Sequence, residues 1–152
     1  MKKIILASFI ILSLTQCTQA NNNANSESKA ATAAGTKQIT RAEFLTKVFD
    51  YTKDTKEINF LGKKPVIVDF YATWCGPCRQ LSPLLEELAV EYDGKIDVYK
   101  IDTDKERELA QELGIQALPT VVFFPKSGKP IAIQGFRPKD ELKKMIDESL
   151  LK

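Results

Sequence analysis

Two cysteines three positions apart, Cys75 and Cys78, are the side chains of this chain best suited to chemistry. The segment Trp74-Cys75-Gly76-Pro77-Cys78 can close a small disulfide ring and open it again. In the loop-entropy account a disulfide stabilises a fold more when it closes a longer loop, so a ring this small constrains little of the unfolded chain. The spacing therefore indicates electron transfer between thiols and disulfides rather than mechanical stapling.

The rest of the composition excludes several other chemistries. The 152 residues include no histidine, which removes Cys-His and Ser-His catalysis and every histidine-containing metal site. A zinc site needs four ligands, commonly two separated cysteine pairs, and Cys17 is the only cysteine outside the one pair present. No glycine fingerprint for a dinucleotide is present either. We therefore expect no metal and no bound cofactor.

The charges are balanced in the part of the chain that is expected to fold. The formal net charge is +2, but Lys2, Lys3 and Lys29 precede residue 37 with only one acid, Glu27. Nucleic-acid binding normally demands a basic face. We therefore expect no nucleic-acid partner, and we expect the lysines and arginines to form an ordinary solvated surface.

The chain begins with the pattern of an export signal. Lys2 and Lys3 give it a positive start, and Ile4 to Leu14 are largely apolar. This apolar run is too short to span a bilayer, which takes about 20 residues, and it fits a secretory signal peptide.

The processing site has two interpretations. Leu14-Thr15-Gln16-Cys17 resembles the lipobox of bacterial lipoproteins, in which the signal is cut before a cysteine that is then lipidated. Gln16 departs from the small residue usual at that position. We expect a signal over residues 1–16 and lipidation of Cys17, and thus a protein anchored on the periplasmic side of the cell envelope. The alternative is ordinary cleavage after Ala20, which gives a soluble periplasmic protein.

A tether and one domain follow. Residues 17–37 are rich in Asn, Ala, Ser and Thr, and cannot bury enough apolar surface to offset their chain entropy. Residues 38–152 have the length of a single domain.

Hydrophobic periodicity predicts the elements of this domain. A capping box at Thr40 and Glu43 opens a short helix, and a second such pair, Thr103 and Glu106, opens a helix that ends at Gly114. A further helix follows the cysteine motif to about residue 92, and a last one spans 142–150. Strands are expected at 65–71, 96–101, 120–124 and 131–133. The order predicts an α/β fold with a mixed central β-sheet flanked by helices on both faces.

Residues 40–151 strongly resemble the thioredoxin family, which implies a thioredoxin-like fold. The resemblance is carried by spaced motifs: Val68-Asp69-Phe70, Trp74 to Cys78, Lys100, Ala117-Leu118-Pro119-Thr120, and Gly135. Cys75 is then expected at the exposed start of a helix, where backbone N–H groups and the helix dipole favour a thiolate. It attacks a substrate disulfide, and the more buried Cys78 resolves the mixed disulfide.

The resemblance also implies roles for two charged residues, Asp69 and Lys100. Asp69 matches a buried residue that helps deprotonate the resolving cysteine, and burial raises the pKa of a carboxyl group. The alternative is an aspartate at a strand edge, facing water. Lys100 matches a lysine near that aspartate, with a plain exposed strand lysine as its alternative.

Docking of the substrate is implied at a further set of positions. Pro119 matches the family's cis proline opposite the active cysteine, which leaves the backbone of Leu118 to pair with an extended substrate strand. Trp74, Gly76 and Gly135 are expected to rim the docking surface, with core packing as the alternative for Trp74. Pro77 is expected to tune the redox potential through its fixed φ and missing N–H, or else merely to start the helix.

We expect a monomeric protein-disulfide reductase of the cell envelope, because Gly-Pro is the dipeptide of reducing thioredoxins. Potentials in the family run from about −270 mV for thioredoxin itself to about −120 mV for the periplasmic oxidant. The alternatives are a disulfide oxidase or isomerase, a reductase for apocytochrome c maturation, and a chaperone or binding module without catalysis. The substrates are expected to be protein disulfides, and an upstream membrane protein is expected to donate the electrons.

Overall fold

The computed structural model describes residues 35–53 and 59–152. The predicted signal, Cys17 and almost all of the predicted tether lie outside the described residues. Within the two described ranges, no helix combines the length and the apolar composition that a membrane span requires.

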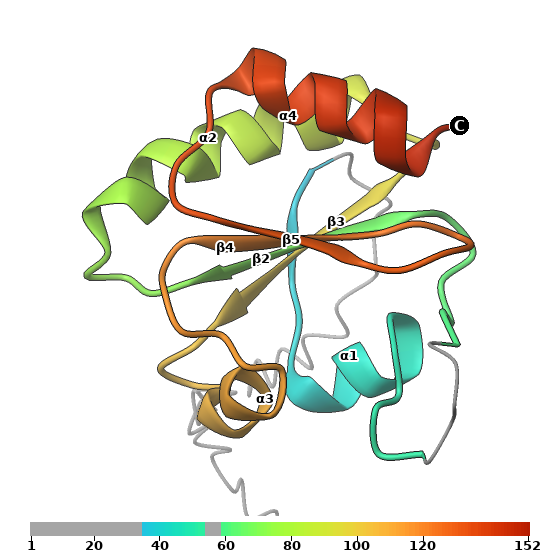
Figure 1. Ribbon diagram of the computed structural model, residues 1–152. Helices are drawn as coiled ribbons and strands as arrows, with labels where there is room; N and C mark the ends of the chain where they lie inside the picture. Colours follow the sequence, from blue (N-terminus) through green and yellow to red (C-terminus); the bar gives the residue numbers. More distant parts are fainter. Residues whose placement is uncertain (1–34, 54–58) are drawn as a thin grey trace, which may run out of the picture. The chain divides into compact units, whose positions relative to one another are not determined.

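A mixed five-stranded sheet forms the centre of the domain (Figure 1). Its strands lie in the order β1-β3-β2-β4-β5, with β1, β2 and β3 parallel and β4 and β5 antiparallel to their neighbours. The bounds are β1 Lys37–Gln38, β2 Val66–Tyr71, β3 Asp97–Asp102, β4 Thr120–Phe124 and β5 Ile131–Gln134. The mixed sheet is confirmed, but the sequence missed β1, a two-residue edge strand of Lys and Gln.

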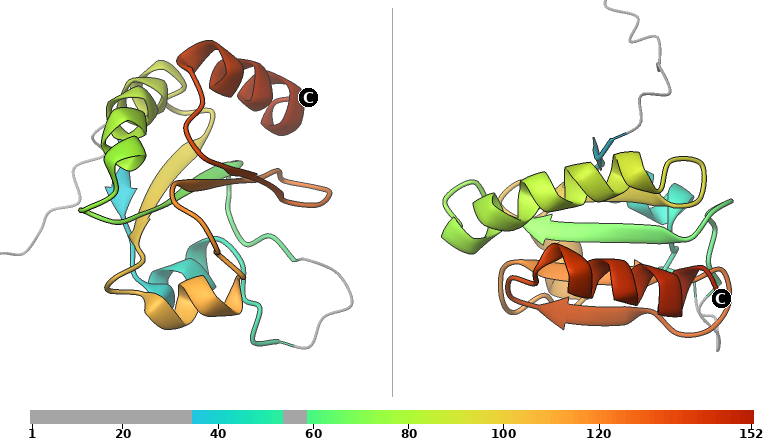
Figure 2. Two further views of the ribbon diagram at one scale, coloured as in Figure 1. Left: turned by 60° about the vertical axis from the view of Figure 1, so that its left-hand side comes forward. Right: turned by 90° about the horizontal axis from the view of Figure 1, so that it is seen from above.

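Helices cover both faces of the sheet, as predicted (Figure 2). α2 (Gly76–Glu91) and α4 (Lys139–Met145), which continues into the π-helical turn η1 (Ile146–Leu150), pack on one face. α1 (Arg41–Lys47) and α3 (Arg107–Glu112) pack on the other. Each face therefore has its own apolar core, separated by the sheet.

Successive residues of β2 supply these two cores in turn, because side chains alternate across a strand. Val66, Val68 and Phe70 belong to the core beneath α1 and α3. Ile67 belongs to the core beneath α2 and α4. Asp69, two positions further along, therefore lies on the face that α2 covers.

The predicted capping box of α1 is confirmed. The Thr40 side chain accepts a hydrogen bond from the Glu43 N–H, and the Glu43 side chain accepts one from the Thr40 N–H. The second predicted box, Thr103 with Glu106, is wrong. The Thr103 hydroxyl donates instead to the Tyr71 carbonyl, 3.1 Å away, and Glu106, the residue before α3, makes no capping bond.

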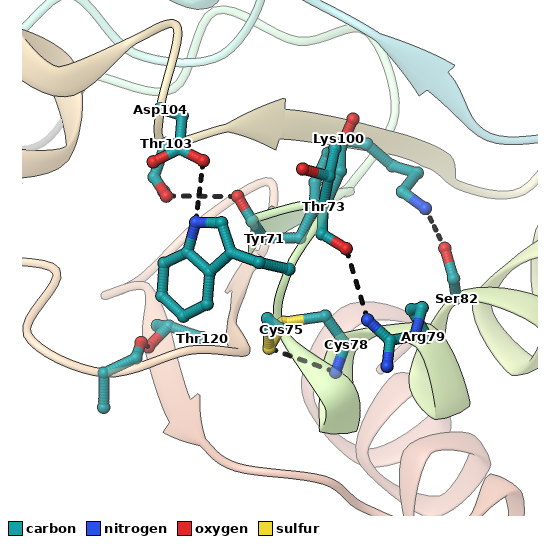
Figure 3. Close-up of a disulfide and its surroundings, with 12 residues drawn as sticks. Tyr71, Thr73, Cys75, Cys78, Arg79, Ser82, Lys100, Thr103, Asp104 and Thr120 are labelled. Atoms are coloured by element: carbon teal, nitrogen blue, oxygen red, sulfur yellow. Dashed lines mark hydrogen bonds between the residues drawn. A yellow bond between two sulfur atoms is a disulfide. The ribbon is translucent and has the colours of Figure 1, made fainter.

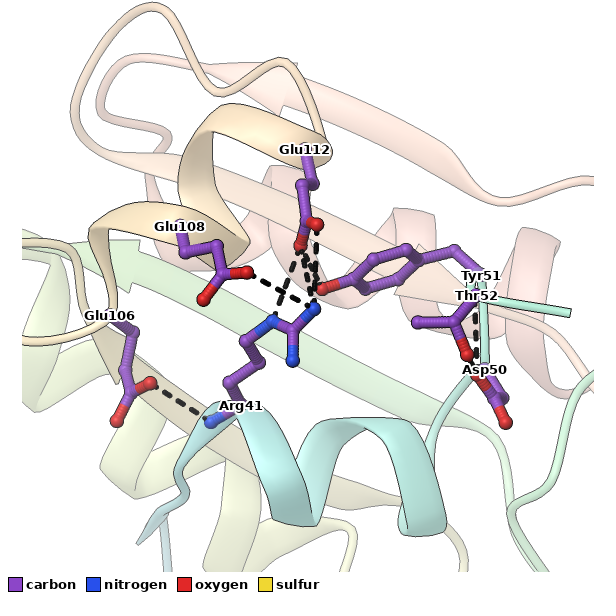
Figure 4. Close-up of polar contacts among 7 residues, drawn as sticks. All are labelled: Arg41, Asp50, Tyr51, Thr52, Glu106, Glu108 and Glu112. Carbon is purple, nitrogen blue, oxygen red and sulfur yellow. Dashed lines mark hydrogen bonds and ion pairs between the residues drawn. The ribbon is translucent and has the colours of Figure 1, made fainter.

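Glu106 is instead part of a cluster that joins α1 to α3 (Figure 4). Its carboxylate accepts from the Arg41 N–H at 3.1 Å, while the Arg41 guanidinium pairs with Glu112 at 3.2 Å and Glu108 at 3.5 Å. The Tyr51 hydroxyl also donates to Glu112. Glu106, which the sequence pattern predicted to be part of a capping box, therefore binds instead to Arg41, 65 positions earlier in the sequence.

Candidate active site: a dithiol at the start of a helix

Cys75 and Cys78 form a disulfide at the start of α2 (Figure 3). Cys75 has extended backbone angles and occupies the capping position before the helix, and its Cα lies 5.3 Å from that of Cys78. The Cys78 N–H donates to the Cys75 sulfur over 3.2 Å. Once the disulfide is reduced, this donor and the positive end of the helix dipole favour the thiolate of Cys75.

The two cysteines are buried to nearly the same extent. The expectation of an exposed Cys75 is wrong, since Cys75 is 4% exposed, close to the 3% of Cys78. They differ in what surrounds them: Cys75 lines an open hollow of about 460 Å³, and Cys78 is not among its lining residues. Access from outside therefore favours Cys75 as the attacked and attacking sulfur.

Most of the expected docking residues line this hollow. Trp74, Gly76, Pro77 and Leu118 do so together with Cys75. Trp74 is 68% exposed, so its alternative as a core residue is wrong. Its indole N–H donates to the Asp104 carboxylate at 2.8 Å, which holds the ring in place in the lining of the hollow.

Pro119 and Gly135 lie next to the hollow rather than in its lining. The Leu118–Pro119 peptide bond is cis, as the resemblance implied. Gly135 adopts a positive φ of 83°, and its N–H donates to the Pro119 carbonyl at 2.8 Å. In the part of the chain that the structure describes, the N–H and C=O of Leu118 have no hydrogen-bond partner, so both are open to a bound strand.

Asp69 is fully buried in the central strand β2, which rules out the water-facing alternative. Neither carboxylate oxygen has a hydrogen-bond partner among the described residues. Burial raises the pKa of Asp69 from 3.8 to about 6, against the opposing effect of the Lys100 charge. The group therefore exchanges a proton near neutral pH.

Lys100 lies beside Asp69 across the β2–β3 pairing, on the same face of the sheet. It is half-buried, with its ammonium 4.8 Å from the centre of the Tyr71 ring and hydrogen-bonded to the Ser82 hydroxyl of α2 (Figure 3). The alternative of a plain exposed lysine is therefore wrong.

The Lys100–Ser82 contact also places Cys78. Residues four apart on a helix lie on one face, so Cys78 and Ser82 both face the sheet from α2. Ser82 meets Lys100, and Lys100 is the register neighbour of Asp69. The resolving cysteine thus faces the part of the sheet that holds the buried carboxyl group.

Sequence reasoning missed two residues of this site, Ser82 and Asp104. Ser82 has a detectable signal, because it lies one helical turn after Cys78. Asp104 has none in the sequence, because it follows β3 and reaches Trp74 only through the sheet. Over residues 35–53 and 59–152, no three Cys, Asp or Glu side chains gather as a metal site would require.

Comparison with known proteins agrees with this geometry. The Thioredoxin family model matches residues 37–148. A thioredoxin of Borreliella burgdorferi is 47% identical over 110 residues, which cover 72% of this chain and 93% of that protein. A thioredoxin of Staphylococcus epidermidis is 45% identical over 107 residues, covering 70% and 98%. A crystal structure of chloroplastic thioredoxin z, described as defining a type-specific target recognition, superposes with a TM-score of 0.61 at 32% identity, covering 76% of this chain and 95% of that one.

Proposed function

Because this chain belongs to the thioredoxin family and is a thiol–disulfide oxidoreductase for protein disulfides, we propose that it works as a disulfide reductase of the cell envelope. The observation that carries the proposal is the asymmetry of the pair: Cys75 alone of the two lines the open hollow. The Gly76-Pro77 dipeptide favours the reducing direction.

The reaction follows from that asymmetry. The Cys75 thiolate attacks one sulfur of a substrate disulfide, forming a mixed disulfide and releasing the other substrate sulfur as a thiolate. Cys78 then loses its proton and attacks the Cys75 sulfur, which releases the second substrate thiolate. Two electrons pass to the substrate, and the Cys75–Cys78 disulfide is left behind.

Asp69 is the proposed acceptor of the Cys78 proton. Its carboxyl group lies on the sheet face toward which Cys78 points, and its pKa of about 6 lets it hold or release a proton near neutral pH. Lys100, which lowers that pKa, is proposed to keep enough of the carboxylate form available.

The substrate is proposed to dock as an extended strand over the hollow. The open N–H and C=O of Leu118 supply main-chain pairing, and Trp74, Gly76 and Pro77 supply the surrounding walls. Pairing through the backbone suits many substrate sequences. The protein is proposed to act as a monomer.

The direction of electron flow is tested by the midpoint potential of Cys75–Cys78 together with an insulin-reduction assay. We expect a potential near that of thioredoxin, about −270 mV, and rapid insulin reduction. A potential near −120 mV with no insulin reduction would assign the protein as an oxidase instead.

The proposed location rests on the lipobox-like residues before Cys17. We propose a lipid anchor there, with residues 17–37 as a tether and a membrane protein as electron donor. Cells fed a radioactive fatty acid are expected to label the native chain and not the Cys17→Ala variant. Equal labelling of both, or of neither, contradicts the anchor, and cleavage after Ala20 is then the remaining route.

A further inference from the structure

Five lysines surround a second hollow, of about 380 Å³, at the end of the sheet away from the dithiol. We call this group the lysine pole, and its members are Lys63, Lys64, Lys95, Lys126 and Lys152. Among the described residues no acidic side chain lines the hollow, and its other lining residues are a proline and two leucines. The sequence analysis expected the lysines to form an ordinary solvated surface, and it did not predict that five of them gather here.

Ion pairs are fewer at the pole than among the other lysines of the described residues. Five of the nine other lysines in the described ranges have a carboxylate partner, as Lys139 and Lys143 do in the glutamates of α2. Within the described ranges, Lys64 is the one member of the pole with a carboxylate partner, Asp97 at 3.5 Å. Four of the five lysines of the pole therefore have no carboxylate partner among the described residues, in a domain whose total charge is balanced.

The fold puts the pole opposite the active site. Lys64 lies just before β2, whereas Cys75 comes soon after its end, and the six residues of β2 span about 20 Å. In Figure 1 the start of α2 lies on the left, and the β4–β5 turn and the C-terminal end of the chain lie on the right. A surface that binds the pole therefore leaves the hollow beside Cys75 open.

We propose that the lysine pole docks the domain on an anionic phospholipid surface, with the dithiol facing away from the membrane. The lysines come from several segments around a wide mouth, an arrangement that suits a sheet of negative headgroups. Leu151, 37% exposed among them, can reach the apolar side of the headgroup layer. This inference takes its setting from the proposed envelope location and adds a second membrane contact to the lipid anchor.

The test uses the unlipidated domain, residues 35–152. This region matches 93% or more of the length of two thioredoxins, so it corresponds to a whole folded protein. Co-sedimentation is measured with vesicles of phosphatidylcholine alone and of equal parts phosphatidylcholine and phosphatidylglycerol. We expect binding to the anionic vesicles only, weakening as salt is added.

The variant Lys63→Gln/Lys95→Gln/Lys126→Gln is compared with a control of equal net charge, Lys37→Gln/Lys47→Gln/Lys105→Gln. Each lysine near an anionic surface strengthens binding about fivefold, so loss of three should weaken binding of the pole variant about a hundredfold, whereas the control should change little. Insulin reduction in solution should be the same in both, which shows that both are folded.

Three outcomes would overturn the proposal. They are equal binding to neutral and anionic vesicles, equal losses in the two triple variants, and binding to polyglutamate but not to vesicles. The last would assign the pole to an acidic protein. Because no lipidated residue is present, failure here leaves the Cys17 proposal intact, and absence of fatty-acid label leaves the vesicle result intact.

Discussion

Replacing Asp69 by asparagine removes a carboxyl group that the fold buries without a hydrogen-bond partner among the described residues. In the unfolded chain this group ionises near 3.8, and in the folded domain near 6, because burial penalises the charge. Between these two values the folded state holds a proton that the unfolded state has lost. The free energy of unfolding therefore falls as the pH rises through this window, and the loss is complete above the folded pKa.

The size of the effect follows from the two pKa values. At about 1.4 kcal/mol for each pKa unit, moving from 3.8 to about 6 corresponds to about 3 kcal/mol. Asparagine has nearly the same shape and carries no proton to lose. We therefore expect the Asp69→Asn variant to gain up to about 3 kcal/mol over the native domain between about pH 4 and about pH 8.

The assay is urea denaturation of the oxidised domain at a series of pH values, because the Cys75–Cys78 disulfide keeps the thiols from titrating. The difference in free energy of unfolding between the two proteins is plotted against pH, so that the contributions of the other titrating groups cancel. An Asp93→Asn variant, altered at an exposed carboxyl, serves as the control and should stay within about 0.5 kcal/mol. A difference in free energy of unfolding that stays constant with pH, or that grows as the pH falls, would refute the argument that burial penalises the charge of Asp69.

Three further predictions concern Lys100 and Asp104 near the active site and the Thr40 cap of α1. Lys100→Gln removes the charge that lowers the pKa of Asp69, so that pKa should rise above about 6, seen as an alkaline shift in carboxyl carbon NMR; an unchanged titration contradicts the pairing. Asp104→Ala removes the acceptor of the Trp74 indole, and should raise KM for insulin by roughly fivefold with little change in kcat, reflecting about 1 kcal/mol of lost positioning. Equal KM values would show that the bond does not hold the ring for substrate. Thr40→Ala breaks the capping box of α1 and should cost about 1 kcal/mol in denaturation, whereas no loss would mean that packing alone fixes the helix.

Local sequence pattern was sufficient for the elements whose signals lie within a few residues. Thr40 and Glu43 form their box as predicted, because both partners belong to one helical turn. The strands β2 to β5 lie where apolar runs predicted them, and in β2, β3 and β4 these apolar side chains are buried in the core. The last helix is also where expected, with Leu142, Ile146 and Leu150 buried.

Pattern failed where a distant group competes for the same side chain. Glu106 binds the Arg41 N–H and Thr103 binds the Tyr71 carbonyl, so the box that their spacing suggests does not form. β1 has no apolar signal of its own, because its two residues pair only along the edge of β3.

The sequence by itself determined the chemistry of this protein. The spacing of Cys75 and Cys78 and the motifs around them belong to the covalent sequence, so they are the same whatever the fold. Only the tertiary structure decided which cysteine is accessible and which charged groups lie near the pair. It buries both sulfurs yet opens a hollow at one, and it places Asp69 beneath α2 beside Lys100. Accessibility and electrostatics depend on distances between segments that are remote in sequence, and those distances exist only once the sheet has formed.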